Sequence, residues 1–293
     1  MTYNTLIVLL TAGLLGAVCG AVGVPIVLQR RGLTSDVIAH AALPGMALSF
    51  WMTRSKSVAV LLVGALISGL LAVACLQVFR RFRVSSDSAL AVVLTAFFGA
   101  GIMFSQMVQN AVTDGSAAGL DGFLFGKASG LVRADLFVLI AVGVVVALLM
   151  IALRKEVRMT VFDPEFAQLN GFRPRTTEAV LTFLLGAIVV LGLPMVGVVL
   201  VAALTIVPAL CGRLLADGYG RVVGLAAGIG LVSAVSGVLI SDRVAKAPTG
   251  PLIILSAAVI FLAAIIFSPQ RGLLSAWRTR RHQRRQAEAQ WTR

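Results

Sequence analysis

Asp36 and His40 are the two residues of this chain whose types and spacing could bind a metal ion. They stand four positions apart in a long apolar segment, and His40 is the only histidine before the basic C-terminal segment. On a helix this spacing places both side chains on one face, where a carboxylate and an imidazole can reach the same cation. Ionisable side chains in such a segment are costly, so they are candidates for function.

A proline adds a third donor to this pair. Pro44 has no N–H to give the carbonyl of His40, so we predict a helix break at Pro44 and Gly45 and a free carbonyl beside the two side chains. Carboxylate, imidazole and carbonyl suit manganese, iron or zinc. In the competing interpretation Asp36 only caps a helix that starts after Arg31, and His40 bonds to a neighbouring helix. One chain supplies too few ligands for a closed site, and a second copy could donate an equivalent pair across a symmetry axis.

The composition predicts an all-α membrane protein. The chain has 293 residues, is 59% hydrophobic and 13% charged, and repeatedly runs about twenty residues with little charge. Nine candidate spans cover residues 6–28, 34–52, 57–79, 88–108, 134–153, 177–193, 195–215, 222–240 and 251–267. Gly192 and Pro194 separate the sixth and seventh spans, and the count becomes eight if one of these is re-entrant.

The basic residues predict the orientation in the membrane. With the N-terminus outside and the C-terminus inside, twelve Lys and Arg residues fall in inner loops and six in outer loops. The inner set is Arg30, Arg31, Arg80, Arg81, Arg83, Arg154, Lys155, Arg158, Arg173, Arg175, Arg213 and Arg221. The net charge of +13 lies beside the spans, so we expect contact with membrane lipid and no nucleic acid. Residues 1–268 form the predicted transmembrane domain, and residues 269–293 a disordered basic cytoplasmic tail.

The inner loop 154–176 contains a short helix that we predict to be a docking element for another protein. Asp163 can cap this helix, Pro164 suits its first position, and Gly171 can close it. Phe166 and Leu169 would share an apolar face. The element comprises Phe162, Asp163, Pro164, Glu165, Phe166, Ala167, Gln168, Leu169 and Gly171. The alternative is a helix that lies on the lipid surface.

The sequence carries no ATPase motif. The only Gly-Lys pair is Gly126-Lys127, and the glycines around it do not complete a phosphate-binding loop. Any energy that the protein uses must therefore come from an ion gradient or from another polypeptide. The glycine-rich outer segment 119–135 is too short for a span and fits a re-entrant or half-helix.

Two small-residue spacings predict close packing between helices. They are Gly16 with Gly20, and Gly224 with Gly228.

Several segments, taken in order, resemble the permeases of manganese, zinc and iron ABC importers, the ABC-3 family. They are residues 35–45 (SDVIAHAALPG), 87–90 (DSAL), 123–126 (FLFG) with Asp135, 162–167 (FDPEFA) with Gly171, 196–204 (VGVVLVAAL) and 206–209 (IVPA). The sequence departs from the commoner pattern at Ser35 and Val37, where Gly and Ala are usual, and at Asn170, where small or aliphatic residues are more frequent.

The resemblance implies a type II importer in the bacterial cytoplasmic membrane. Two permease subunits, identical or paralogous, would form the pathway, two cytoplasmic ATPase subunits would drive it, and an extracytoplasmic protein would deliver the metal. Asp36 and His40 match positions proposed to bind the transported ion, and residues 163–171 match the helix that docks on the ATPase. The chain would be no enzyme and would hold no permanent cofactor, with ATP bound only by its partner. The alternatives are a permease for a metal chelate such as a siderophore and a gradient-driven secondary transporter.

Overall fold

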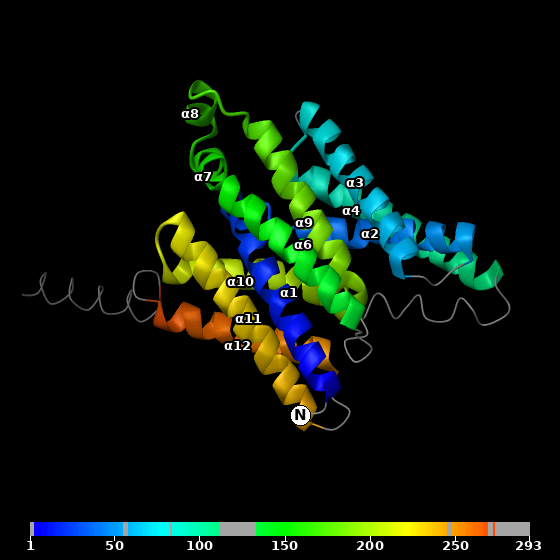
Figure 1. The fold of residues 1–293 in the computed structure, drawn as a ribbon. Helices are drawn as coiled ribbons and strands as arrows, with labels where there is room; N and C mark the ends of the chain where they lie inside the picture. The colour runs from blue at the N-terminus through cyan, green and yellow to red at the C-terminus, as the bar shows by residue number, and fades with distance from the viewer. Residues whose placement is uncertain are drawn as a thin grey trace, which may run out of the picture.

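A computed structural model describes residues 3–54, 58–82, 84–111, 133–244, 248–268 and 272. Within these ranges all regular structure is helical (Figure 1). The helices are α1 (Tyr3–Leu28), α2 (Thr34–Thr53), α3 (Val58–Arg81), α4 (Ser86–Ala111), α6 (Arg133–Ala152), α7 (Arg154–Phe162), α8 (Pro164–Leu169), α9 (Pro174–Val196), α10 (Val198–Leu215), α11 (Tyr219–Arg243) and α12 (Thr249–Phe267). Residues 119–132 of the predicted re-entrant segment, including the 123–126 motif, and all of the tail except Gly272 lie outside the described residues.

The long helices of the described ranges coincide with the predicted apolar segments. Seven of them are long and apolar enough to cross a membrane, and α6 and α7 together, bent by 65°, give an eighth candidate. α2 is as long as α6 but carries Ser35, Asp36, His40 and Pro44, and it does not reach the same apolarity. The chain is therefore an all-helical membrane protein, as predicted. The count of nine spans and the orientation of the termini stay predictions.

The boundary between the sixth and seventh predicted spans was placed wrongly. α9 continues through Gly192 and Pro194, and the break falls at Gly197 instead, where the backbone has a φ of 87°. This left-handed conformation is readily open only to glycine. Gly192 is needed for packing, because a Cβ there would lie 2.7 Å from the side chain of Val201.

α1 runs along the middle of the molecule and packs against α11, α10, α6 and α9. Its contact with α11 is at backbone distance, since a Cβ at Gly16 would collide with the carbonyl of Gly230, and one at Gly20 with that of Ala226. The predicted role of Gly16 and Gly20 is therefore confirmed. Gly224 and Gly228 instead face open space, so this second spacing does not bring helices of the described part together.

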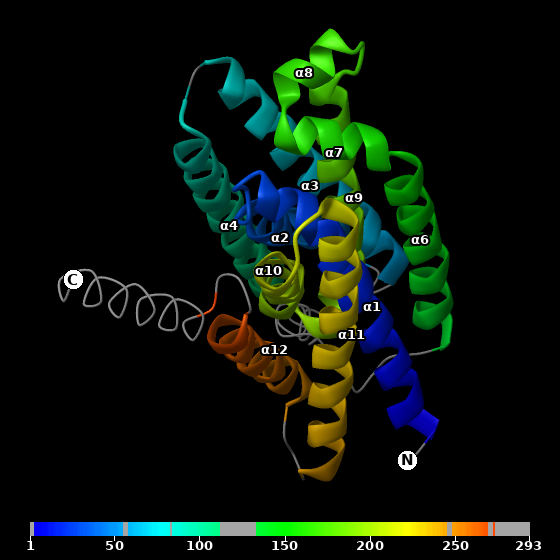
Figure 2. The ribbon, with the colours of Figure 1, turned by 90° about the vertical axis from the view of Figure 1, so that its left-hand side faces the viewer.

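The remaining helices form two groups. α2, α3 and α4 pack with one another beside the α1–α11 core, and α2 and α10 cross α1 and α11 steeply (Figures 1 and 2). α7 and α8 project at the end of the molecule away from the N-terminus in both views. α1 starts at the opposite end and contacts α7.

Candidate metal site and docking helix

α2 packs against other helices over most of its surface, and Asp36 and His40 lie on its one less buried face. Val37 joins a small apolar cluster with α3 and α4, while Ile38 and Ala42 belong to the main core. The side chains of Asp36 and His40 are 33% and 22% exposed. Most of α2 is thus held by burial, and its two ionisable side chains stay accessible to a small ion.

The two side chains meet at a distance that suits a shared ion. Asp36 Oδ1 lies 3.3 Å from His40 Nε2. Oxygen and nitrogen ligands sit about 2.0–2.2 Å from zinc, so two neighbouring ligands of one ion are about 3.0–3.5 Å apart. The Phe98 ring of α4 meets the imidazole edge-on, with centroids 4.8 Å apart, and restricts its rotation. The separation of the two atoms is therefore compatible with a shared ion.

The second imidazole nitrogen of His40 is not held in place by a hydrogen bond within the described ranges. Nδ1 is buried and makes no hydrogen bond within the described ranges. Histidines that hold a resident metal almost always donate their other N–H to an oxygen, which fixes the ring and strengthens the bond. The described part also contains no group of three or more His, Cys, Asp or Glu side chains that could hold a metal. The described part of one chain therefore offers two side-chain ligands, fewer than a closed site needs.

The helix break predicted at Pro44 and Gly45 does not interrupt α2, which continues through both residues. α3 approaches so closely that a Cβ at Gly45 would collide with the Gly64 carbonyl, and a Cβ at Gly101 of α4 would lie 3.0 Å from the Pro44 ring. This close packing explains why the helix continues, since neighbours compensate for one lost hydrogen bond. The His40 carbonyl still lacks the N–H that proline cannot provide.

The capping interpretation of Asp36 has no support in the geometry. The N-cap residue of α2 is Leu33, which makes no side-chain capping bond, and Asp36 lies inside the first turn. Its carboxylate is instead the neighbour of His40.

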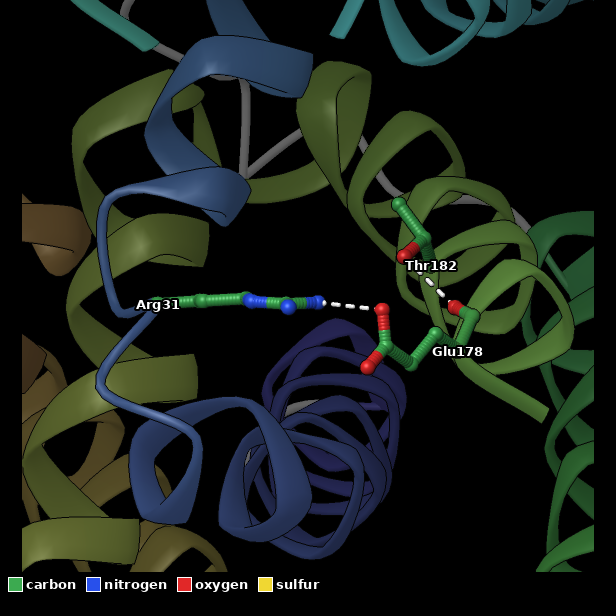
Figure 3. Close-up of polar contacts among 3 residues, drawn as sticks. All are labelled: Arg31, Glu178 and Thr182. Atoms are coloured by element: carbon green, nitrogen blue, oxygen red, sulfur yellow. Dashed lines mark hydrogen bonds and ion pairs between the residues drawn. The ribbon is translucent and has the colours of Figure 1, made fainter. Parts of the chain in front are cut away.

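An ion pair missed from the sequence joins the approach to α2 with the start of α9. Arg31 Nη1 donates to Glu178 Oε2 at 2.8 Å, and these side chains are 23% and 19% exposed (Figure 3). Arg31 is aimed by the turn that ends α1, in which Arg30 adopts a φ of 58° and the Arg31 N–H bonds to the Ile26 carbonyl. The partners are 147 positions apart in sequence, so no local pattern could indicate them.

The short helix predicted in the loop 154–176 forms as α8. Asp163 is its N-cap and accepts a hydrogen bond from the Phe166 N–H at 2.9 Å, with Pro164 at the first position. Asn170 closes the helix through its side chain, which donates to the Phe166 carbonyl, and Gly171 follows with a φ of 82°. These local bonds give a six-residue helix a fixed shape.

α8 presents an apolar surface away from the rest of the chain. Ala167 is buried, whereas Phe162, Phe166 and Leu169 are 62%, 52% and 87% exposed. The sequence analysis missed α7, which precedes α8 and buries Val157. The spacing of Val157 and Thr160, both buried and opposite the basic residues, is the signal that could have revealed it.

Neutral variants of the Arg31–Glu178 pair test its contribution to stability. We expect Arg31→Gln and Glu178→Gln each to lower the free energy of unfolding by about 1–3 kcal/mol, because each removes one half of an ion pair between partly buried side chains. The double variant should lose less than the sum of the two single losses. Thermal unfolding in detergent measures all three, with Arg30→Gln as the control on an exposed neighbour. Fully additive losses would contradict the contact.

The comparisons with known proteins agree with this architecture. A model of the ABC 3 transport family matches residues 1–268. A manganese transport system membrane protein of Bacillus subtilis, MntC, is 39% identical over 98% of this chain, which spans 66% of that protein. A zinc transport system membrane protein of Treponema pallidum, TroC, is 39% identical over 91% of this chain and 90% of its own length. A solved structure of PsaBC from Streptococcus pneumoniae in complex with Fab superposes with a TM-score of 0.79 at 29% identity, over 92% of this chain and 94% of that one. The chain belongs to the ABC 3 transport family of membrane permeases.

Proposed function

We propose that this chain is the permease subunit of an ATP-driven importer for a divalent transition metal ion: manganese, zinc or iron. The observation that carries the proposal is the 3.3 Å contact between Asp36 and His40 on the accessible face of α2. Relatives named for manganese and for zinc transport support an ion of this class. The ligand set does not choose among these ions, because mixed oxygen and nitrogen sites accept several.

The site would hold the ion briefly. An importer must release its cargo, so binding along the path has to stay weak. The unsupported Nδ1 of His40 and the lack of a third side-chain ligand among the described residues both weaken the site. A second permease subunit, identical or paralogous, would bring a matching carboxylate and imidazole across the dimer axis.

Energy would arrive from a separate ATPase at α8. Phe166 and Leu169 expose large apolar surfaces on a helix with a fixed shape. Exposed apolar side chains on such a helix are typical of a contact site for another protein. α8 lies at the end away from the N-terminus, which fits an outside N-terminus and a cytoplasmic α8 in the bacterial inner membrane (Figure 2). A binding protein on the outer side would deliver the ion.

The Arg31–Glu178 pair offers a direct route for movement from α8 to α2. Glu178 lies near the start of α9, which follows α8. Arg31 belongs to the connection that leads into α2 and stands five positions before Asp36. A displacement of α8 and the start of α9 would therefore pull on the segment that positions the metal pair.

The two rival functions receive less support. A metal-chelate permease needs no ligand for a bare ion, yet Asp36 and His40 stand at ligand spacing. A gradient-driven transporter needs no exposed docking helix such as α8. The relatives named for manganese and zinc transport fit the proposed function better than either rival.

Neutralising the metal pair tests the proposal. We expect Asp36→Asn and His40→Ala each to reduce manganese or zinc uptake by about tenfold or more, because each removes one ligand. Uptake into proteoliposomes that hold the permease, its ATPase and the binding protein is the measurement, with ATP and without it.

The matched controls are Asp242→Asn and His282→Ala. Asn keeps the acceptor for the hydrogen bond that Thr5 donates to Asp242, and His282 lies in the tail. Both controls should transport normally. Wild-type uptake by both pair variants would contradict the metal assignment, and uptake without ATPase or ATP would favour a secondary transporter.

Replacing Leu169 tests the docking role of α8. We expect Leu169→Asp to weaken ATPase binding by about tenfold or more, because a charge replaces an exposed apolar anchor. Co-purification of the ATPase with the permease measures this, and Thr176→Asp, on an exposed residue of α9, is the control. Equal ATPase recovery with both variants would contradict docking at α8.

A further inference from the structure

A cavity of about 770 Å³ opens where α6 bends into α7 and where α11 begins. Arg154, Lys155 and Arg158 of α7 line one side, and Arg221 of α11 lines the other. Asp217 is the single acidic residue of the lining. Four cations around one cavity repel one another unless an anion lies among them.

The start of α11 adds donors to the same cavity. Gly218, its N-cap residue, has no side chain to cap the helix and lines the cavity together with Tyr219 and Gly220. The N–H groups of the first turn have no partner within the helix, and such N-termini favour anions. The 25-residue α11 therefore directs the positive end of its dipole toward the basic side chains.

Tyr219 provides an independent sign of a missing ligand. It lines the cavity, its side chain is only 9% exposed, and its hydroxyl has no hydrogen-bond partner in the described part of the chain. Buried tyrosine hydroxyls usually find a partner. The hydroxyl is enclosed, so a phosphate oxygen in the cavity would accept this bond only after a turn of the ring exposes it.

The cavity also has an apolar wall that continues onto an exposed apolar stretch of α6. Met150, Ile151 and Val223 line it, and Ile151 is 63% exposed on α6, as is its neighbour Leu148 at 61%. α1 lies between α6 and α11 and packs against both (Figures 1 and 2). An anion with a long apolar part could thus place its charge beside Arg158 and its chain along α6.

We propose that this cavity binds the phosphate headgroup of an anionic phospholipid. Basic pockets between membrane helices recognise such headgroups through charge, and the apolar wall distinguishes a lipid from a soluble phosphate. The phosphate would lie between Arg158, Arg221, the Tyr219 hydroxyl and the first turn of α11. A lipid held there would fix the bend between α6 and α7, and with it the arm that carries α8. The binding itself does not depend on which ion is transported.

Lipid binding by the full-length chain tests the proposal. Native mass spectrometry in detergent would count bound cardiolipin or phosphatidylglycerol against phosphatidylcholine at equal concentration. We expect the wild type to prefer the anionic lipids, and Arg158→Gln/Arg221→Gln to reduce that preference by about tenfold, because two charge-assisted hydrogen bonds are lost. Tyr219→Phe should weaken it by about threefold or more, since one neutral hydrogen bond contributes less.

The matched control is Arg30→Gln/Arg175→Gln, which removes the same charge from exposed residues outside the cavity. This variant should bind anionic lipid as the wild type does. An equal loss in the control and cavity variants, or none in the cavity variant, would overturn the proposal. Displacement of the lipid by millimolar inorganic phosphate would assign the cavity to a soluble anion and overturn it too. Loss of ATPase co-purification with unchanged lipid binding would assign the cavity to the ATPase instead.

Discussion

The position of Asp36 and His40 depends on how closely α3 and α4 approach α2. Glycines make this approach possible: Gly64 meets the backbone of α2 at Gly45, and Gly101 meets Pro44. Membrane helices gain little from the hydrophobic effect between them, so close contact of small residues supplies much of their cohesion. Larger residues at these points would separate α2 from its neighbours. The ionisable pair would then lose the surroundings that keep both side chains on one accessible face.

A second set of contacts connects this helix with the end that carries α8. The turn after α1 directs Arg31 to Glu178, and α9 leads back from α8 to that same point. The proposed lipid cavity lies where α6 bends by 65° into α7. The arm formed by α7 and α8 is therefore joined to the ion pair through α9 and to the proposed lipid contact through α7. We expect its position to depend on both.

Structural features that depend on neighbouring residues in the sequence could be predicted from local patterns. The apolar runs indicated the long helices, because a chain in lipid must satisfy its backbone bonds within helices. The capping residues of α8 and the four-residue spacing of Asp36 and His40 could also be identified from the sequence. The glycine that ends α9 could not be predicted, because Gly192 packs against Val201 inside the helix and does not end it. Nor could the sequence reveal Glu178 as the partner of Arg31, or the cavity that α7 and α11 line together, because folding alone brings these distant residues near one another.

In the proposed transport path, the imidazole of His40 binds the transported metal. X-ray absorption spectroscopy of zinc held by the ATP-free permease and ATPase complex would detect this bond. The proposed site predicts oxygen and nitrogen ligands at about 2.0–2.2 Å with outer-shell scattering from imidazole, and His40→Ala should remove the imidazole signal. An identical spectrum from His40→Ala, or a wild-type spectrum without imidazole, would contradict the claim.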